Sequence, residues 1–282
     1  MLSYRHGFHA GGWSEVLKHV VLTILIAHLR KKAAPFTVVD AYAGDAVYDL
    51  ASPEVQKTHE FETGIARIYD ADKAPEGVRA YLEAVRTQNA GGRLSRYPGS
   101  PALIKTFLRD SDRLIANELH PTAHQALAKW ARGDPRIAVH KRDALEFLGW
   151  VATSRLKRGL ALIDPVYEVK AEYSDLPETL SRALRSWPQG IYAIWYPVLA
   201  AGRHRTLLKS ISEALRASGT VKAVACELGP TTPPPIGLKS TGMIVINPPW
   251  SFEADLRESA GWLAQSLWAP GKGRYTLVPL SS

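Results

Sequence analysis

Short apolar runs alternate with helix-like segments along most of the chain. Each run has the continuous apolar character of a buried strand and ends in a polar residue or a turn signal. The segments between them mostly carry apolar residues at helical spacing. This alternation predicts a mostly parallel sheet covered by helices on both faces. The predicted strands are Phe36–Asp40, Leu114–Glu118, Ile137–His140, Leu160–Asp164, Ile191–Tyr196, Val221–Glu227 and Met243–Asn247, and the predicted helices are 15–31, 101–109, 121–132, 143–150, 178–186 and 204–218.

The first predicted helix begins after Ser14, which is a suitable N-cap, and Pro35 ends the segment that follows it. Between the first two strands lies a long stretch, about 47–98, with helical patterns of its own. We interpret that stretch as a helical insertion. The chain is therefore expected to be a single domain, 1–282, with an N-terminal tail and helix at 1–32.

Composition narrows the class of protein. The 282 residues are 46% apolar and 22% charged, which is typical of a globular protein and excludes disordered and fibrous classes. The 35 Lys and Arg residues exceed the 27 Asp and Glu residues, and the net charge of +8 favours a polyanionic partner. Cys226 alone cannot form an internal disulfide framework. With no secretory signal and no apolar run long enough for a bilayer, we expect a cytoplasmic protein without membrane contact.

The turn after the first strand indicates the kind of cofactor. The segment Val38–Ala46 contains Gly44 as its single glycine, and Asp45 follows it. A dinucleotide site requires a G-x-G-x-x-G turn that lets the backbone approach a pyrophosphate, and Asp45 would repel phosphate. The turn therefore favours a cofactor without phosphates, such as S-adenosylmethionine.

Two further acids follow the next strands. Glu118 ends the second strand, where a carboxylate can accept hydrogen bonds from both ribose hydroxyls of a ligand in the crevice above an α/β sheet. Asp143 follows the third strand and could accept from an adenine amine. Both acids could instead be helix N-caps or surface residues, and Asp143 is a good N-cap candidate for the helix after it.

Two strands end in tetrads typical of enzymes that methylate exocyclic amines of nucleobases. These are Asp164-Pro165-Val166-Tyr167 and Asn247-Pro248-Pro249-Trp250. In such enzymes an acidic side chain and a main-chain carbonyl accept the two N–H bonds of the amine, which frees its lone pair for in-line attack on a methyl group. The proline fixes the carbonyl, and the aromatic side chain stacks on the base.

Chain order favours the first tetrad. Asp164 closes the fourth strand, which in a sheet of this class lies beside the cofactor strand. Asn247 closes a strand expected to be antiparallel, which would deliver it to the opposite edge. We therefore expect Asp164, Pro165 and Tyr167 to be catalytic. A turn-forming Asp-Pro dipeptide remains the alternative for Asp164.

Motifs along the whole chain resemble the RlmJ-type family of bacterial large-subunit ribosomal RNA adenine-N6 methyltransferases. The resemblance implies an α/β fold of the class I S-adenosylmethionine-dependent, Rossmann-like type, with a seven-stranded mostly parallel sheet, its last strand antiparallel, and a helical insertion. It implies methyl transfer to adenine N6 in 23S ribosomal RNA. The matching segments are 1–11, 16–19, Glu62 with 64–68, 97–101, 118–121, 195–198 and 240–250.

The resemblance also assigns residues. Asp164 would be the catalytic acceptor, and Tyr4, His6 and Lys18 would lie near the target nucleotide. The positions that would bind or line the cofactor are His19, Tyr42, Gly44, Ser100, Glu118, Asp143, Ala144 and Asp164. Ser100 could instead be only an N-cap, since Pro101 follows it.

Three residues depart from the family pattern. Val166 stands where a second proline is usual, Ala46 replaces a glycine, and Tyr42 replaces a histidine. Because Pro165 is kept, we expect activity to survive with a looser loop. The spacings His6/His9 and His120/His124 could suggest a metal, but no third ligand is evident and we expect none.

Three basic clusters fit contact with a phosphate backbone. We expect the partner to be 23S ribosomal RNA, either protein-free or in an early assembly intermediate, and the enzyme to be a monomer. A DNA adenine methyltransferase, or a nucleic-acid-binding protein that has lost catalysis, remain alternatives. The clusters are Arg136, Lys141 and Arg142; Arg155, Lys157 and Arg158; and Arg203, His204, Arg205 and Lys209.

Overall fold

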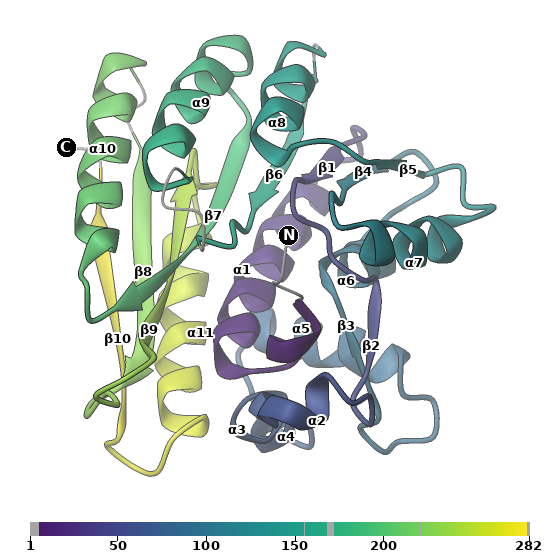
Figure 1. Cartoon of the computed structure of the whole chain (residues 1–282), viewed down its shortest axis with the longest axis vertical. Helices are drawn as coiled ribbons and strands as arrows, with labels where there is room; N and C mark the ends of the chain where they lie inside the picture. Colours follow the sequence, from purple (N-terminus) through teal and green to yellow (C-terminus); the bar gives the residue numbers. More distant parts are fainter. Residues whose placement is uncertain (1–5, 155, 168–171, 220–221, 281–282) are drawn as a thin grey trace.

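A computed structural model describes residues 6–154, 156–167, 172–219 and 222–280. Within these residues one large sheet runs through the molecule (Figure 1). Its eight strands follow the order β10-β8-β9-β7-β6-β1-β4-β5. They are β1 (Thr37–Asp40), β4 (Arg113–Asn117), β5 (Ile137–His140), β6 (Gly159–Ile163), β7 (Ile191–Leu199), β8 (Ala223–Pro230), β9 (Leu238–Ile246) and β10 (Gly273–Pro279).

The sheet is parallel at its centre and antiparallel at one side. β1 pairs in parallel with β4 and β6, β4 with β5, and β6 with β7. β9 lies antiparallel between β7 and β8, as expected for the strand that ends at Asn247. The α/β prediction is confirmed, but the number of strands was wrong. β10 adds an eighth strand, antiparallel to β8. It lies at the sheet edge with alternating exposure, so its sequence lacks the continuous apolar run that marks a buried strand.

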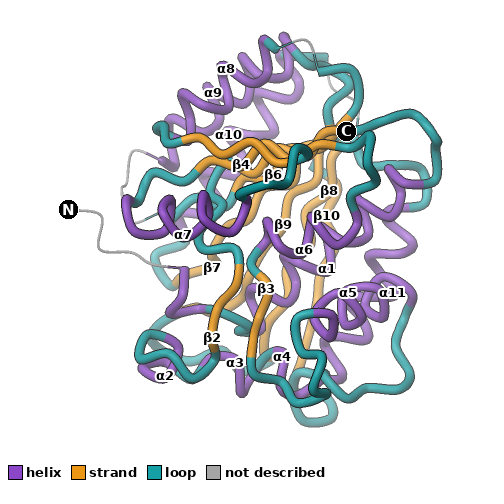
Figure 2. Tube along the Cα trace, turned by 90° about the vertical axis from the view of Figure 1, so that its right-hand side faces the viewer, coloured by secondary structure: helices purple, strands orange, loops and turns teal. Residues whose placement is uncertain are grey.

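Helices cover both faces of the sheet (Figure 2). Successive strand residues point to opposite faces, so Val38 packs with one helical layer and Val39 with the other. The first layer contains α1 (Trp13–Arg30), α5 (Glu76–Thr87), α6 (Ser100–Phe107), α7 (Pro121–Ala131) and α11 (Phe252–Ser266). The second contains α8 (Ala144–Thr153), α9 (Glu172–Ser186) and α10 (Arg203–Ala217).

The insertion leaves and rejoins the sheet at one place. β2 (Val47–Asp49) and β3 (Arg96–Pro98) pair antiparallel at its two ends. Tyr81 of α5 shares one buried cluster with Val21 of α1. Because the insertion has no core separate from that of the sheet, we propose that it belongs to the same domain. Its shorter helices are α2 (Val55–Thr58), α3 (Glu60–Thr63) and α4 (Ile65–Ile68), and the 3-10 helix η1 (His6–His9) precedes α1.

The predicted cap Ser14 was wrong, and so was the alternative that made Ser100 a cap. The residue before α1 is Gly12, not Ser14, and the residue before α6 is Gly99, which puts Ser100 at the first helical position. Both glycines lie against other parts of the chain. A Cβ on Gly99 would come within 2.4 Å of the Asp45 carbonyl oxygen, so this close approach requires a glycine immediately before the helix.

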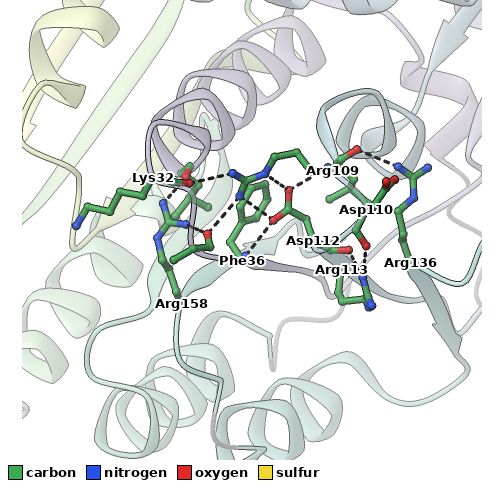
Figure 3. Close-up of polar contacts among 11 residues, drawn as sticks. Lys32, Phe36, Arg109, Asp110, Asp112, Arg113, Arg136 and Arg158 are labelled. Atoms are coloured by element: carbon green, nitrogen blue, oxygen red, sulfur yellow. Dashed lines mark hydrogen bonds and ion pairs between the residues drawn. The ribbon is translucent and has the colours of Figure 1, made fainter.

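An arginine cluster braces the edge of the sheet where the parallel strands begin (Figure 3). Arg109 donates from Nε to Asp112 Oδ2 at 2.8 Å and from Nη1 to the Lys32 carbonyl at 2.9 Å. The buried Asp112 in turn accepts the Phe36 N–H at 3.1 Å. Arg158 donates to the carbonyls of Leu29 and Ala34. These bonds tie the end of α1 to the starts of β1 and β6.

Candidate active site

The opposite edge, where the parallel strands end, brings the candidate residues together. β1 and β6 are neighbours in the sheet, and the Ala41 N–H donates to the Leu162 carbonyl at 3.0 Å. Asp164 follows β6 directly and therefore lies beside the turn that follows β1. Only 7% of Asp164 is exposed. The two segments singled out for cofactor and catalysis are thus adjacent.

Asp164 is part of a buried charged triad. The Lys18 ammonium donates to Asp164 Oδ2 and to Glu15 Oε1, each at 2.5 Å. All three side chains are less than 10% exposed. Burial alone would lower the pKa of Lys18, but the two carboxylates raise it above its ordinary value. Burial raises the pKa of Glu15. Lys18, expected near the substrate, is therefore bound to the candidate catalytic carboxylate.

The loop after Asp164 is held in an uncommon conformation. Tyr167 has a φ of 55°, in the left-handed region that bulky residues rarely adopt. Its hydroxyl donates to the Trp195 carbonyl at 2.9 Å, and its N–H donates to Glu172 Oε2 at 2.5 Å. The other oxygen of Glu172 accepts the Tyr42 hydroxyl at 3.3 Å. Glu172 thus links the turn after β1 to the loop after Asp164, a role that sequence reasoning missed.

Glu118 holds the turn that contains Gly44. Its two carboxylate oxygens accept the Gly44 N–H at 2.8 Å and the His120 N–H at 2.7 Å. Glu118 is 8% exposed, and burial raises its pKa. Each carboxylate oxygen has a second lone pair, so Glu118 can bind these N–H groups and still accept from ribose hydroxyls.

Hydrogen bonds from Asp143 and Asn117 fix the turn after β5. Asp143 Oδ1 accepts the N–H groups of Leu145 and Glu146, so Asp143 is the N-cap of α8 that the alternative interpretation expected. Ala144 is the first residue of that helix and is buried. The fully buried Asn117 amide donates to the Ala41 carbonyl at 3.1 Å and joins this turn to the turn after β1. Asn117 was not predicted, because a strand-end amide carries no distinctive pattern.

The polar side chains at the strand ends suit the polar groups of S-adenosylmethionine. The fully buried Asp40, at the end of β1, has both carboxylate oxygens without a hydrogen bond that meets ordinary geometry among the described residues. Burial raises its pKa to about 7, although the nearby Ser100 hydroxyl lowers it. An acceptor of this kind suits the ammonium group of an amino acid, and Glu118 suits ribose hydroxyls. These residues fit the cofactor.

The second tetrad lies elsewhere. The Asn247 N–H donates to the Lys222 carbonyl at 3.0 Å, and its side-chain amide donates to the carbonyls of Pro188 and Gly190. These residues precede β7 and β8, so Asn247 is at the edge opposite Asp164. The Trp250 side chain is 93% exposed there. The two tetrads thus lie at opposite edges, as chain order predicted.

The N-terminal segment packs on the insertion. His9 Nδ1 lies 2.8 Å from Glu60 Oε1, and the Gly11 carbonyl accepts the Ile65 N–H at 2.8 Å. Tyr4 lies outside the described residues, and of His6 only the backbone, at the start of η1, is described. In the part of the chain that the structure describes, no group of three metal-ligating side chains occurs. No described helix is long and apolar enough to cross a bilayer.

The basic clusters separate in space. Arg136 binds Asp134 and the Leu108 carbonyl, and Arg158 binds backbone carbonyls at the edge far from Asp164. Lys141 and Arg142, by contrast, follow β5 at the candidate active-site edge and are exposed. The first cluster is therefore not continuous. The third cluster begins α10, after β7, and Arg155 of the second lies outside the described residues.

The fold and the site define a class of protein. The central strand order β5-β4-β1-β6-β7-β9-β8, with β9 antiparallel, is that of class I S-adenosylmethionine-dependent methyltransferases. The carboxylates at its strand ends and the Asp-Pro-Val-Tyr loop beside the cofactor turn fit that chemistry.

Comparison with known proteins identifies the family. The family model described as ribosomal RNA large subunit methyltransferase D, RlmJ, matches residues 33–280, and the chain belongs to this family of methyltransferases. The chain is 38% identical to ribosomal RNA large subunit methyltransferase J of Escherichia coli and 35% identical to that of Haemophilus influenzae, with 98% of each chain covered. A crystal structure of a Legionella pneumophila protein superposes with a TM-score of 0.88 at 30% identity, covering 96% of this chain and 98% of the other.

Proposed function

We propose that this enzyme transfers a methyl group from S-adenosylmethionine to the N6 amine of an adenine in 23S ribosomal RNA. The observation that carries the proposal is the position of Asp164. It follows β6 beside the turn after β1, and it is followed by Pro165 in a tetrad suited to amine methylation. The relatives named above support ribosomal RNA as the substrate.

Asp40 would hold the ammonium group of the cofactor and Glu118 its ribose, with Ser100 beside Asp40. Asp143 and Ala144, at the start of α8, would face its adenine. When bound, S-adenosylmethionine supplies an electrophilic methyl group on a sulfonium. Asn117 and Glu172 fix the loops that carry these residues through the bonds described above.

Asp164 and the Pro165 carbonyl would accept the two N–H bonds of the target amine. Two such acceptors localise the nitrogen lone pair and orient it toward the methyl group, which is catalysis by positioning and electrostatics. One amine proton leaves during the reaction, and the Asp164 carboxylate is its acceptor. Lys18 orients that carboxylate through Oδ2 and supplies the opposite charge. Tyr167 would line the base pocket, with its ring 4.5 Å from that of Tyr173.

Exposed cations on both sides of this site would bind the RNA backbone. Lys141 and Arg142 follow β5, and Arg203 and Arg205 begin α10 after β7, so the two pairs flank Asp164 along the sheet edge. Lys31 and Lys32 follow the end of α1 at the far edge, where the Lys32 carbonyl accepts from Arg109 (Figure 3). The pair Lys31 and Lys32 carries the same charge as the pair Arg203 and Arg205 but lies at the opposite edge of the sheet, so it serves as a control.

The proposal is tested by nucleoside analysis. Unmodified 23S ribosomal RNA is incubated with S-adenosylmethionine and the enzyme, digested, and analysed for N6-methyladenosine. The wild type should form it, and Asp164→Asn should lower the rate at least about 100-fold, as for loss of a group acting on the reacting atom. DNA of the same sequence, at the same salt concentration, should remain unmodified. Methylation of DNA instead, or equal activity of Asp164→Asn, would contradict the proposal.

A salt titration tests the RNA surface. Replacing both Arg203 and Arg205 by alanine should reduce the slope of log affinity against log salt by about 1.5, because two phosphate contacts are lost. The matched variant with Lys31 and Lys32 replaced should keep the wild-type slope. Equal slopes for both variants would contradict RNA contact at Arg203 and Arg205.

A further inference from the structure

Trp150 is a large aromatic side chain on the surface of α8. It is 42% exposed, whereas Phe147, one turn earlier, is completely buried. The Arg142 guanidinium lies over the Trp150 ring, 5.3 Å from its centroid. The rings of His140 and Phe147 lie 5.3 Å and 6.0 Å from it, centroid to centroid. Trp150 and Arg142 thus form an exposed aromatic and cationic surface, which we call the Trp150–Arg142 platform.

The backbone of the platform is fixed by the fold. The Arg142 N–H donates to Asn117 Oδ1 at 3.0 Å, and the Asn117 amide donates to the Arg142 carbonyl at 3.0 Å. Asp143, the next residue, caps α8, and Phe147 holds that helix in the core. Because Trp150 belongs to the same helix, the backbone of both platform residues is ordered before any ligand binds, which lowers the entropic cost of binding.

The charges at the platform suit a polyanion. Lys141 and Arg142 are both exposed, and among the residues that the structure describes neither of them pairs with a carboxylate. By contrast, the Arg136 guanidinium is bound to Asp134 and to the Leu108 carbonyl. An exposed guanidinium with available N–H groups is suited to phosphate oxygens. Lysine is depleted in protein interfaces, so this surface favours a nucleic acid over a protein partner.

The platform lies within reach of the candidate active site. Arg142 follows β5 and Asp164 follows β6, with β4 and β1 between these two strands. Neighbouring strands are about 4.8 Å apart, so the two strand ends are separated by roughly 14 Å along the sheet edge. Trp150 lies about 9 Å along the helix axis from Ala144, the first residue of α8. RNA that leaves the active site past β5 would therefore cross the platform.

We propose that the Trp150–Arg142 platform binds an unpaired nucleobase of the substrate RNA, a few nucleotides away from the adenine that is methylated. The base stacks on the exposed indole ring or on the guanidinium, and Lys141 and Arg142 bind the adjoining phosphates. The proposal rests on the proposed function for RNA as the substrate. It specifies that the RNA is single-stranded on this side of the target, because bases in a helix are stacked on one another.

Binding of single-stranded and double-stranded RNA tests the stacking. The probes are a short oligoadenylate and its duplex with oligouridylate, at one salt concentration. Trp150→Ala should weaken binding of the single strand about five- to hundred-fold, the usual effect of losing one stacked base, and that of the duplex less than about two-fold. Trp150→Phe, which keeps a ring, should lie between. Equal weakening of both probes would overturn the proposal. So would unchanged binding of both, which would favour a protein partner at Trp150.

A salt titration with oligoadenylate separates the two platform residues. Trp150→Ala should lower the affinity by the same factor at every salt concentration, because the indole is uncharged. Arg142→Ala should reduce the slope of log affinity against log salt by about 0.7, the value for one phosphate contact of a single strand. A reduced slope for Trp150→Ala would contradict stacking on the ring.

Trp250→Ala is the matched control. Trp250 is 93% exposed and has the Lys222 ammonium 5.9 Å from its ring centroid, but it lies at the opposite edge of the sheet. This variant should bind both probes within about two-fold of the wild type, as expected for a surface change away from the contact. Trp150→Ala should bind S-adenosylhomocysteine as the wild type does, which shows that the start of α8 is intact.

Methylation of 23S ribosomal RNA separates this proposal from the proposed function. Trp150→Ala should raise the KM for unmodified RNA at an unchanged kcat, because the platform does not touch the reacting amine. If the wild type methylates no RNA but Trp150→Ala still loses affinity for oligoadenylate, the proposed function fails and the platform stands. If the wild type methylates RNA and Trp150→Ala binds oligoadenylate as tightly as the wild type, only the platform fails.

Discussion

Replacing Lys18 by methionine should destabilise the fold far more than replacing Asp164 by asparagine. The Lys18 ammonium joins two buried carboxylates, so Lys18→Met leaves Glu15 and Asp164 without their shared cation. Breaking a buried pair in this way costs about 3–5 kcal/mol. In Asp164→Asn the ammonium keeps Glu15, and the amide can still accept from it, so the expected cost is roughly 1 kcal/mol.

The assay is urea unfolding followed by circular dichroism at neutral pH. Domains of ordinary stability unfold with about 5–15 kcal/mol, so Lys18→Met should show a strongly lowered midpoint at an unchanged slope. Adding Glu15→Gln to Lys18→Met should restore part of the loss, because one stranded carboxylate becomes neutral. The reasoning is refuted if Lys18→Met and Asp164→Asn are equally stable, or if the added Glu15→Gln destabilises further.

Two other variants test the supports of the site. Asp40 has a pKa of about 7 in the folded protein, above the ordinary 3.8, so the folded state binds its proton more tightly. Stability without cofactor should therefore fall as pH rises from about 4 to 7, by at most about 4 kcal/mol, and Asp40→Asn should lose this dependence in thermal melts. Glu172→Ala removes the acceptor that holds the N–H of Tyr167, and should lower kcat about tenfold (roughly 1.4 kcal/mol) with a KM for cofactor that stays within about threefold. Glu172→Gln, which keeps one acceptor oxygen, should retain more activity than Glu172→Ala, and the reverse order would contradict this role.

The central strands, and the edge of the sheet at which each tetrad lies, could be predicted from sequence. Buried parallel strands are continuous apolar runs, so β1 and β6 were placed to within a residue at each end. Chain order then separated Asp164 from Asn247, because direction within the sheet decides which edge a strand end reaches. The two tetrads have similar sequences, and that similarity alone does not tell which edge of the sheet each tetrad occupies.

The contacts that assemble the site could not be predicted in the same way. Lys18 and Asp164 are 146 residues apart in the sequence, and no local pattern marks their pairing. Glu172 bonds to the Tyr42 hydroxyl, 130 residues away in the sequence, and to the nearby Tyr167 N–H. β10 was missed because only one of its faces is covered, and α11, which packs on α1, was missed as well. Such residues become visible only when the topology is known.

A crystal structure with S-adenosylhomocysteine and an adenosine analogue tests the central claim most directly. The account predicts that the exocyclic amine lies within hydrogen-bond distance of an Asp164 oxygen and of the Pro165 carbonyl. The amine nitrogen should also face the cofactor sulfur, with room for the transferred methyl group on the line between them. An amine bound beside Asn247, or an amine with neither Asp164 oxygen within hydrogen-bond distance, would contradict the account.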